Sequence, residues 1–202
     1  MTPAEALHRG LGELALELPA GAHERLLRYM ELLAKWNRTY NLTAIRDPLE
    51  MVSHHLLDSL VVIPHLPMHA GTLADVGSGA GLPGIPLAIA RPQWAVTLND
   101  ASQKKTAFLR QASIELGLDN VAIRDGRVET WHPATRFAVV ISRAFTELAR
   151  FIASCRHLVA PGGVLAAMTG AAPQAPCAGE VIALRVPLLD AARHLVLCRV
   201  ED

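Results

Sequence analysis

Residues Leu73–Ile89 read LADVGSGAGLPGIPLAI, an apolar segment with an acid near its end, followed by a glycine-rich turn and a second apolar segment. Gly77, Gly79 and Gly81 alternate where the chain must turn sharply. Glycine there permits both a positive φ and the close approach of a ligand to the backbone. A strand, a glycine turn and a helix in this order open nucleotide-binding α/β sheets. The stretch therefore predicts a cofactor site where the first strand ends.

Two kinds of nucleotide are compatible with this turn. Gly79–Gly84 fits the dinucleotide fingerprint GxGxxG, a string with a high false-positive rate on its own. Asp75 stands two residues before the first glycine, and its carboxylate is expected to project near the cofactor. A carboxylate there would repel a pyrophosphate and attract the ammonium and sulfonium groups of S-adenosylmethionine. We therefore favour S-adenosylmethionine.

A second acid supports a nucleotide site without deciding which nucleotide binds. Asp100 closes the next predicted strand, Ala95–Asp100, about 20 residues further on, where such folds place a ribose-binding carboxylate. For either acid alone, a role in a turn is the better explanation. For the pair in this setting, a cofactor site is the better one.

Length and composition indicate a cytoplasmic protein. The chain has 202 residues, enough for one domain with an appended helical lobe, and 51% of them are hydrophobic. No run approaches the roughly 18 apolar residues of a membrane span, and the N-terminus lacks the layout of a signal peptide. Cys155, Cys177 and Cys198 show no metal-ligand spacing and are expected to be reduced. We expect a monomer without a membrane anchor.

The charge is balanced overall and uneven locally. The 19 basic and 19 acidic residues cancel, which argues against a general nucleic-acid-coating protein. Segment 101–156 carries nine basic residues against five acidic ones, a local excess of +4. Such an excess beside a cofactor site suits a protein that contacts a few phosphates. Solvated helix faces give similar counts, so both interpretations stay open.

The first seventy residues are predicted to be helical. Thr2–Glu5 is a capping box, and Asp47–Glu50 repeats this design. Between them, an apolar stripe of helical period runs from about Ala22 to Asn37. Trp36–Thr43 is expected to be a loop whose aromatic, amide and basic groups suit base stacking and phosphate contacts. From composition alone, a helix end with core aromatics is the better explanation of that segment.

No metal site is predicted. His54, His55 and Asp58 lie close together in sequence, but their spacing fits no zinc pattern. A partly exposed histidine pair is the better explanation.

Beyond the glycine turn, apolar strands alternate with helices. Helices are predicted at Ser102–Leu116 and Thr146–Leu158, and a turn at Pro161–Gly163. The predicted strands are Ala95–Asp100, Val121–Arg124, Phe137–Ser142, Val164–Met168, Val181–Val186 and His194–Val200. Repeated βα units indicate an α/β fold with a mainly parallel sheet, and the last two strands should form an antiparallel hairpin. We expect residues 1–70 to form an N-terminal helical extension packed on a core of residues 71–202.

Six segments, in the same order along the chain, carry a family resemblance. They are WNRTYNLTAIRDP at Trp36–Pro48, HLLDS at His55–Ser59, DVGSGAGLPGIPLAIA at Asp75–Ala90, KKTAFLRQ at Lys104–Gln111, GRVE at Gly126–Glu129 and SRAF at Ser142–Phe145. With them, the chain resembles the RsmG (GidB) family, ribosomal RNA small-subunit methyltransferase G. The glycine turn is shared by many methyltransferases, whereas the first segment and SRAF are far more specific.

The resemblance implies a Rossmann-like class I methyltransferase that transfers a methyl group from S-adenosylmethionine to N7 of a guanine in 16S ribosomal RNA of the small subunit. Guanine N7 has a free lone pair and no proton to remove, so positioning can supply most of the rate gain. No general base is required, and no catalytic residue is predicted. The donor contacts that we expect are Asp75, Gly77, Gly79, Leu82, Asp100, Val128, Glu129 and Arg143, and the RNA-binding candidates are Arg38, Asn41, Lys104, Lys105, Arg127 and Arg143.

Two departures from the family pattern concern the substrate. The family usually carries Arg before the HLLDS histidine and Lys before the glycine that follows the fifth strand, where this chain has His54 and Thr169. Both changes remove positive charge and should affect RNA affinity more than donor binding. Two rival functions stay open: a methyltransferase of the same fold that acts on a small molecule or a protein, and an RNA-binding module without turnover.

Overall fold

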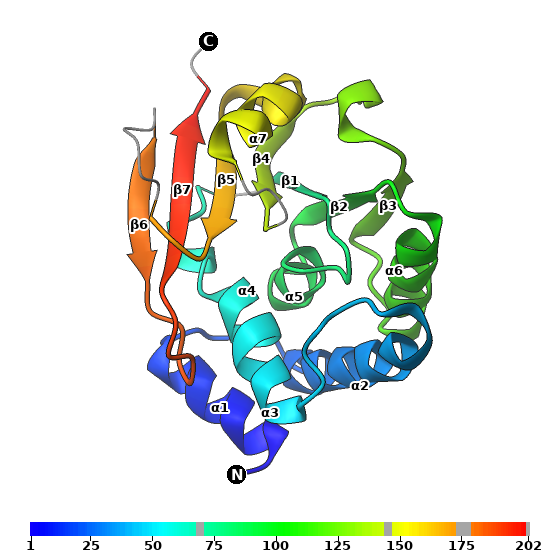
Figure 1. Ribbon diagram of the computed structural model, residues 1–202, viewed down its shortest axis with the longest axis vertical. Coiled ribbons are helices and arrows are strands. Elements are labelled where there is room, and N and C mark those ends of the chain that lie inside the picture. The colour runs from blue at the N-terminus through cyan, green and yellow to red at the C-terminus, as the bar shows by residue number, and fades with distance from the viewer. Residues whose placement is uncertain (68–70, 144–146, 173–178, 201–202) are drawn as a thin grey trace.

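One twisted sheet forms the centre of the molecule (Figure 1). The structure is a computed structural model that describes residues 1–67, 71–143, 147–172 and 179–200. In these ranges the strand order is β3-β2-β1-β4-β5-β7-β6. The strands are β1 (Thr72–Val76), β2 (Ala95–Asp100), β3 (Val121–Asp125), β4 (Phe137–Ser142), β5 (Val159–Thr169), β6 (Glu180–Leu184) and β7 (Arg193–Arg199).

Strand direction confirms the predicted fold class. The pairs β1–β2, β1–β4, β2–β3 and β4–β5 are parallel, while β7 runs antiparallel to both β5 and β6. The C-terminal hairpin is therefore present, with β7 inserted between β5 and β6. Because β1 has parallel neighbours on both sides, the carboxyl ends of β1, β2 and β4 meet at one edge of the sheet.

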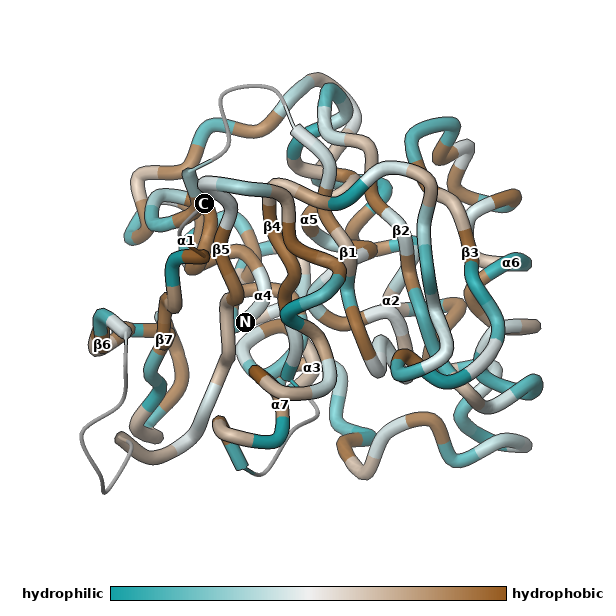
Figure 2. Tube along the Cα trace, turned by 90° about the horizontal axis from the view of Figure 1, so that it is seen from above, coloured by the Kyte–Doolittle hydropathy of each residue, from teal (hydrophilic) through white to brown (hydrophobic). Residues whose placement is uncertain are grey.

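Helices cover both faces of this sheet. They are α1 (Pro3–Glu13), α2 (Ala22–Tyr40), α3 (Pro48–Met51), the π-helix η1 (Val52–Leu57), α4 (Asp58–Leu60), α5 (Gly84–Ala90), α6 (Gln103–Glu115) and α7 (Leu148–Cys155). Short 3-10 helices follow at η2 (Ile63–His65), η3 (Val128–Thr130) and η4 (Arg156–Leu158). Figure 2 shows hydrophobic residues along the central strands β4 and β5, as expected for strands that are buried on both faces.

Alternation along each strand divides the core into two clusters. Leu73 points to the face covered by α1, α2, α5 and α6, where it joins Leu26 and Leu98 in one cluster. Ala74 points to the opposite face, where Phe151 of α7 lies. Successive side chains of a strand point to opposite faces, so neighbouring residues of β1 serve different cores. The N-terminal helices thus share a core with the glycine-turn side of the sheet.

The capping box at Thr2 is present. Glu5 N donates to Thr2 Oγ1 at 3.2 Å, and Thr2 N donates to Glu5 Oε2 at 2.7 Å. These bonds satisfy two backbone donors at the first turn of α1, which buries Ala6 and Leu7 against the core.

Thr2→Ala is expected to lower the free energy of unfolding by about 1 kcal/mol, because one orphan N–H of the first turn loses its partner. Urea denaturation measures this loss. Thr2→Ser is the matched control, since it keeps the hydroxyl and should retain most of the stability. An equal loss in both variants would contradict a role of the cap.

Two predicted boundaries are wrong. Helix α2 continues to Tyr40, so most of the expected loop at Trp36–Thr43 is helical, and the helix ends where Asn41 takes a φ of 50°. Trp36 stacks on Tyr40 at a ring distance of 5.1 Å, and Asn37 is buried. The expected loop is therefore wrong, and the explanation that composition favoured, a helix end with core aromatics, is confirmed, since Trp36 packs against the core.

Strand β5 is the other correction. It begins at Val159 and includes Pro161–Gly163, which we expected to be a turn. Gly162 has a φ of 71° and donates to Val200 O at 3.1 Å, while Val200 N donates to Gly163 O at 2.9 Å. The pairing register of β4 and β5 shifts between Phe137 and Val139, which indicates a bulge. The predicted helix start at Thr146 lies outside the described residues.

The region after the Asp47 cap was only partly predicted. Asp47 Oδ1 accepts from Leu49 N and Glu50 N, as the sequence indicated. The chain then forms a continuous α3–η1–α4 stretch whose middle, Val52–Leu57, is a π-helix. π-Helical turns are rare and occur frequently at functional sites. This one carries His54 and His55.

Candidate functional site

The glycine turn follows β1 at the edge where the parallel strands end. Gly77, Gly79 and Gly81 have φ values of 69°, 59° and 89°, which is the left-handed region that favours glycine. A Cβ on Gly81 would lie 2.5 Å from Ile85 Cδ1, whereas a Cβ on Gly79 would meet nothing nearer than Gly77 O at 3.9 Å. Gly79 thus lies beside open space that a ligand can occupy.

Contacts from other elements hold this turn in place. Tyr29 Oη, from α2, donates to Ala80 O at 2.6 Å and is fully buried. Asp100 Oδ2, at the end of β2, accepts from Gly79 N at 3.0 Å. The turn is therefore fixed both by the N-terminal helices and by the neighbouring strand.

Asp75 is buried beneath the turn. Its Oδ2 accepts from Gly84 N, the first residue of α5, at 2.8 Å, and Oδ1 has no hydrogen-bond partner in the described part of the chain. A Cβ on Gly84 would lie 2.2 Å from Leu98 Cδ2 and 2.8 Å from Asp75 Oδ2, so this contact requires glycine. Burial raises the pKa of Asp75 to about 7, against the Gly84 and Ser78 hydrogen bonds that lower it.

This buried position weakens the expectation that the Asp75 carboxylate favours S-adenosylmethionine over a pyrophosphate. Its side chain has no exposed surface and lines neither of the two pockets described next. A carboxyl group with a pKa near 7 is only partly ionised in neutral solution. Asp75 therefore supports the turn from below, and the expected repulsion of a pyrophosphate loses its basis. The alternation of β1 explains this placement, because Asp75 points to the same face as Leu73.

Asp100 borders a pocket of about 220 Å³ at the ends of β1, β2 and β3. Besides Gly79 N, it accepts from Ser102 N at 2.8 Å, and Lys105 Nζ lies 3.5 Å from Oδ2. A carboxylate offers about four acceptor positions, so acceptor capacity remains toward the pocket. The other expected donor contacts at its rim are Gly77, Val128 and Glu129, and Arg127 also lines it.

A second pocket, of about 180 Å³, lies along the other side of the turn. Gly77 lines both pockets, so the two are adjacent along the turn. The second pocket also contains the expected contacts Gly79, Leu82 and Arg143. We call the two together the donor cleft. It brings together all of the expected donor contacts except Asp75.

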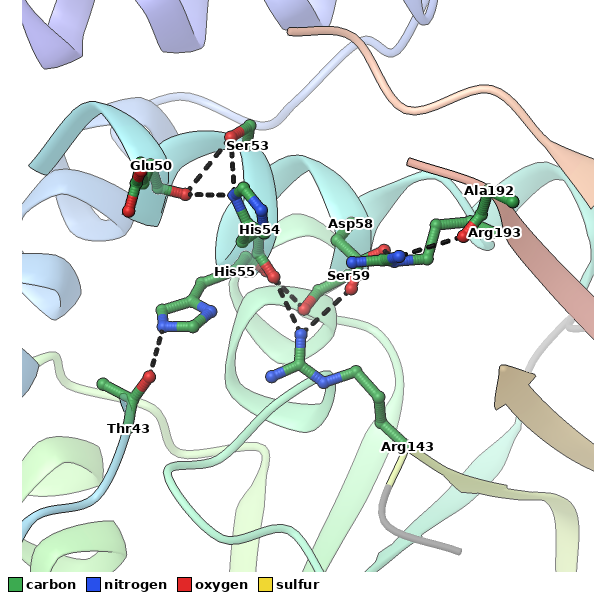
Figure 3. A network of polar contacts seen from close by, with 10 residues as sticks. All are labelled: Thr43, Glu50, Ser53, His54, His55, Asp58, Ser59, Arg143, Ala192 and Arg193. Carbon is green, nitrogen blue, oxygen red and sulfur yellow. Dashed lines mark hydrogen bonds and ion pairs between the residues drawn. The ribbon is translucent and has the colours of Figure 1, made fainter. Parts of the chain in front are cut away.

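Arg143 follows β4 and joins a cluster of charged groups (Figure 3). Its Nη1 donates to Asp58 Oδ2 at 3.0 Å and to the His54 carbonyl oxygen at 2.8 Å. Arg193, from β7, donates through Nε to Asp58 Oδ1 at 3.0 Å. Asp58 is only 1% exposed, so this buried carboxylate fixes two guanidinium groups from distant parts of the chain.

A third pocket, of about 340 Å³, lies beyond Arg143. We call it the outer pocket; it is lined by Ile45, His54, His55, Asp58, Arg143, Met168, Thr169, Gly170 and Arg193. Arg143 lines both the donor cleft and the outer pocket. His54 and Thr169, the two departures from the family pattern, face this same pocket.

His55 is the buried histidine of the outer pocket. It is 3% exposed, and its Nε2 lies 2.9 Å from Thr43 Oγ1. Burial, assisted by the nearby Arg143 charge, lowers the pKa of His55 to about 4. The ring is therefore neutral at physiological pH. The expectation of a partly exposed histidine pair holds for His54, which is partly exposed, and is wrong for His55, which is buried.

The RNA-binding candidates occupy different positions around this edge. Arg38 and Asn41 are exposed at the end of α2, close in sequence to Leu42 and Thr43 of the donor cleft. Lys104 and Arg127 are also exposed, and Arg127 pairs weakly with Glu129 at 3.9 Å. Lys105 is partly buried by its contact with Asp100. Of these candidates, Arg127 and Arg143 line the donor cleft.

Sequence reasoning missed Thr43, Asp58 and Arg193 as site residues. Thr43 and Asp58 lie in the matching segments, so the resemblance contained a signal for them. Arg193 has no local signal, because its role depends on the pairing of β7 beside β5. Within the described residues, no three His, Cys, Asp or Glu side chains gather as metal ligands. Nor does any helix there combine the length and apolar character that a membrane crossing needs.

The solved structures similar to this one include methyltransferases. A glycopeptide N-methyltransferase complexed with S-adenosylmethionine matches with a TM-score of 0.51 at 18% identity, covering 73% of this chain and 67% of the other. A protein from Agrobacterium tumefaciens that is described as a predicted O-methyltransferase matches with a TM-score of 0.54 at 23% identity, covering 71% of this chain and 78% of the other. At these identities the likeness shows the fold.

Sequence relatives are far more similar. Ribosomal RNA small subunit methyltransferase G of Methylobacillus flagellatus is 52% identical over 198 residues, which cover 95% of this chain and 96% of the relative. The protein of the same name from Neisseria meningitidis serogroup A is 50% identical over 205 residues, covering 98% of each. The model of the GidB family, rRNA small subunit methyltransferase G, matches residues 22–186. The chain therefore belongs to the rRNA small subunit methyltransferase G family.

Proposed function

We propose that this protein transfers the methyl group of S-adenosylmethionine to N7 of a guanine in 16S ribosomal RNA of the small subunit. Membership of the family supports the enzyme class and the RNA substrate. The observation that carries the proposal is the donor cleft, where the glycine turn, Asp100 and Arg143 meet at the ligand edge of a methyltransferase fold.

The residues of the donor cleft fit S-adenosylmethionine. Asp100 keeps acceptor capacity for the ribose hydroxyls, and the open space beside Gly79 allows a ligand to approach the backbone closely. Val128 and Glu129 border the pocket next to Asp100, where the adenine would bind. Arg143 lies at the other end, where its guanidinium can pair with the donor's carboxylate. When bound, S-adenosylmethionine supplies an electrophilic methyl group on a sulfonium.

The protein's part in the reaction is to position the acceptor. Guanine N7 attacks with its own lone pair, so no residue has to remove a proton. Holding the acceptor in line with the methyl group can account for most of the rate gain. Arg143, which borders both the donor cleft and the outer pocket, marks the junction where the two reactants meet. N7 is accessible when the base is unstacked from its neighbours.

RNA contacts are proposed for the cations around the cleft. Arg38, Lys104 and Arg127 are exposed and can contact phosphates, while Asn41 can hydrogen-bond a base or a ribose. Lys105 and Arg143 already have carboxylate partners, so their RNA contacts require that they share these bonds. We further propose a cytoplasmic monomer that associates with no membrane, with residues 1–70 as a helical extension on the core of residues 71–202.

Incubation with labelled S-adenosylmethionine and unmodified small ribosomal subunits tests this function directly. We expect label in 16S rRNA, and mapping of the modified base should give N7-methylguanine. Binding of S-adenosylhomocysteine without transfer would instead identify an RNA-binding module. Transfer to a metabolite or a protein would identify a methyltransferase of another specificity.

Asp100→Ala is expected to weaken binding of S-adenosylhomocysteine by about 1.5–3 kcal/mol, the range for a hydrogen bond to a charged group. Calorimetry measures the dissociation constant. Asp119→Ala is the matched control, because Asp119 is exposed and precedes β3 at the opposite edge of the sheet. An unchanged dissociation constant in Asp100→Ala would mean that Asp100 serves only the turn.

A further inference from the structure

The outer pocket is next to the donor cleft and is large enough for a small ligand. Its volume of about 340 Å³ falls in the usual range of ligand sites. Ile45 and Met168 provide apolar surface, while the other lining side chains are mainly polar or charged. Two links connect it to the cleft: Arg143 lines both, and Thr43 of the cleft bonds His55 of the outer pocket. A ligand in this pocket would lie beside the methyl donor.

The orientation and tautomer of His55 follow from its partner. Ile45 N donates to Thr43 Oγ1 at 3.2 Å, so this hydroxyl already accepts one hydrogen bond. Its own proton can then be donated to His55 Nε2, 2.9 Å away. Because the ring is neutral, it has a single proton. When Thr43 Oγ1 is the donor to Nε2, that proton is on Nδ1. His55 Nδ1–H is thus a hydrogen-bond donor held in a fixed direction.

This donor lacks a partner. Nδ1 has almost no exposed surface and no hydrogen bond of good geometry within the described part of the chain, and His55 as a whole is 3% exposed. The backbone of His54 lies close enough to act on the pKa of His55, but its carbonyl oxygen already accepts from Arg143 Nη1 at 2.8 Å. Figure 3 shows the second ring nitrogen on the side that faces Arg143. Buried polar groups are nearly always paired in native proteins, and an unpaired one calls for an explanation. A ligand that brings an acceptor into the outer pocket would satisfy it.

We propose that the outer pocket receives the guanine to be methylated and that His55 Nδ1–H donates a hydrogen bond to its O6. This inference rests on the function proposed above and assigns the base a site. O6 lies next to N7 on the same edge of guanine, so a bond to O6 identifies the base and leaves the N7 lone pair free. Adenine carries an amino donor at that position, which would face the His55 donor and be rejected.

The charged cluster supports this placement. Asp58 holds Arg143 and Arg193 at 3.0 Å each, so the two guanidinium groups stay directed along the wall of the pocket. Both bonds of Arg143 in the described part of the chain leave from Nη1, which leaves Nε and Nη2 for reactants. Ile45 and Met168 can cover the apolar faces of a base ring. Because Nδ1 is covered, the base must displace the neighbouring side chains on entry.

The test compares guanine with 2-aminopurine, which keeps N7 and lacks O6. Each base is placed at the methylated position of the smallest rRNA or reconstituted subunit that the wild-type protein methylates. The readout is kcat/KM for each substrate in the wild type, His55→Gln and His55→Asn. In His55→Gln, the amide can keep a polar atom near Thr43, where Nε2 lies, but the donor at the Nδ1 position is lost. In His55→Asn, the amide keeps a polar atom at the Nδ1 position. Intrinsic differences in N7 reactivity are common to all three proteins and cancel in this comparison.

We expect the guanine to 2-aminopurine ratio of the wild type to exceed that of His55→Gln by about ten- to hundredfold, with His55→Asn in between. Affinity for S-adenosylhomocysteine should be unchanged, which separates base recognition from donor binding. Equal ratios in the wild type and His55→Gln would overturn the inference. If His55→Gln does not fold, His55→Asn carries the comparison, and a guanine to 2-aminopurine ratio equal to that of the wild type overturns the inference. If the wild type forms no N7-methylguanine on any subunit, the proposed function fails instead.

Discussion

The variant Asp75→Asn is expected to lose about 3 kcal/mol more unfolding free energy than the wild-type protein when the pH falls from 6.5 to 4. Two buried groups whose pKa values are shifted in opposite directions determine how stability changes over this pH range. His55 has its pKa lowered from 6.5 to about 4, and Asp75 has its pKa raised from 3.8 to about 7.

The sign follows from proton binding in the two states. Between pH 6.5 and 4, the unfolded chain protonates His55 and the folded chain does not, so acidification removes stability. Between pH 7 and 3.8, the folded chain keeps a proton on Asp75 that the unfolded chain releases, so acidification adds stability. The windows overlap and the contributions oppose each other. Asparagine at position 75 removes the contribution of Asp75, so the loss of stability on acidification that comes from His55 becomes measurable.

Urea denaturation at pH 4, 5, 6 and 7 measures both contributions. His55→Gln removes the contribution of His55 and keeps that of Asp75. Its free energy of unfolding relative to the wild type should therefore rise as the pH falls. Exposed carboxylates such as Asp125, whose pKa is lowered by Thr106 and Arg110, are present in all three proteins and cancel in the differences. Parallel stability curves for the three proteins would refute the assignment of either group.

Asp58→Asn is expected to lower the free energy of unfolding by about 3 kcal/mol and to reduce methyl transfer. Asp58 is 1% exposed and accepts from Arg143 and Arg193, so neutralising it leaves two guanidinium groups without their counter-charge. Breaking a buried ion pair in this way typically costs 3–5 kcal/mol. The low end applies because the arginine side chains are 28% and 23% exposed.

The matched control is an exposed ion pair. Glu13→Gln breaks the bond between Arg9 and Glu13, whose side chains are 63% and 40% exposed, and should cost only a few tenths of a kcal/mol. Urea denaturation of both variants gives the stability difference, and a methylation assay gives the functional loss. A loss in Asp58→Asn as small as that in Glu13→Gln would show that the cluster is not a structural centre of the site.

Much of the fold could be predicted because its signals are local. Alternating apolar segments and helices gave the parallel sheet, and Thr2 and Asp47 marked two helix starts. The boundaries that failed have identifiable causes. The stacked pair Trp36 and Tyr40 extends α2 through an apparent loop, and Gly162 bends β5 without ending it, because Val200 supplies a hydrogen-bond partner.

The donor cleft was also largely predictable. Gly77, Gly79 and Asp100 follow the ends of β1 and β2, and the βα pattern already brings such residues to one edge of the sheet. Leu82, Val128, Glu129 and Arg143 came from the family resemblance, and the structure places them around the same cleft. Asp75 lies outside this cleft, because its distance from the turn along the chain does not reveal on which face of β1 its side chain lies.

The sequence by itself determined the βα order, the glycine turn and the family, since each of them depends on residues that are neighbours along the chain. Only the tertiary structure decided which distant side chains meet. Asp58 contacts Arg143 and Arg193, which are 85 and 135 residues away, and Thr43 fixes the ring of His55. These contacts depend on the insertion of β7 between β5 and β6 and on the packing of the N-terminal helices against the sheet. Such placement is set by the burial of the whole core, which no local pattern of residues specifies.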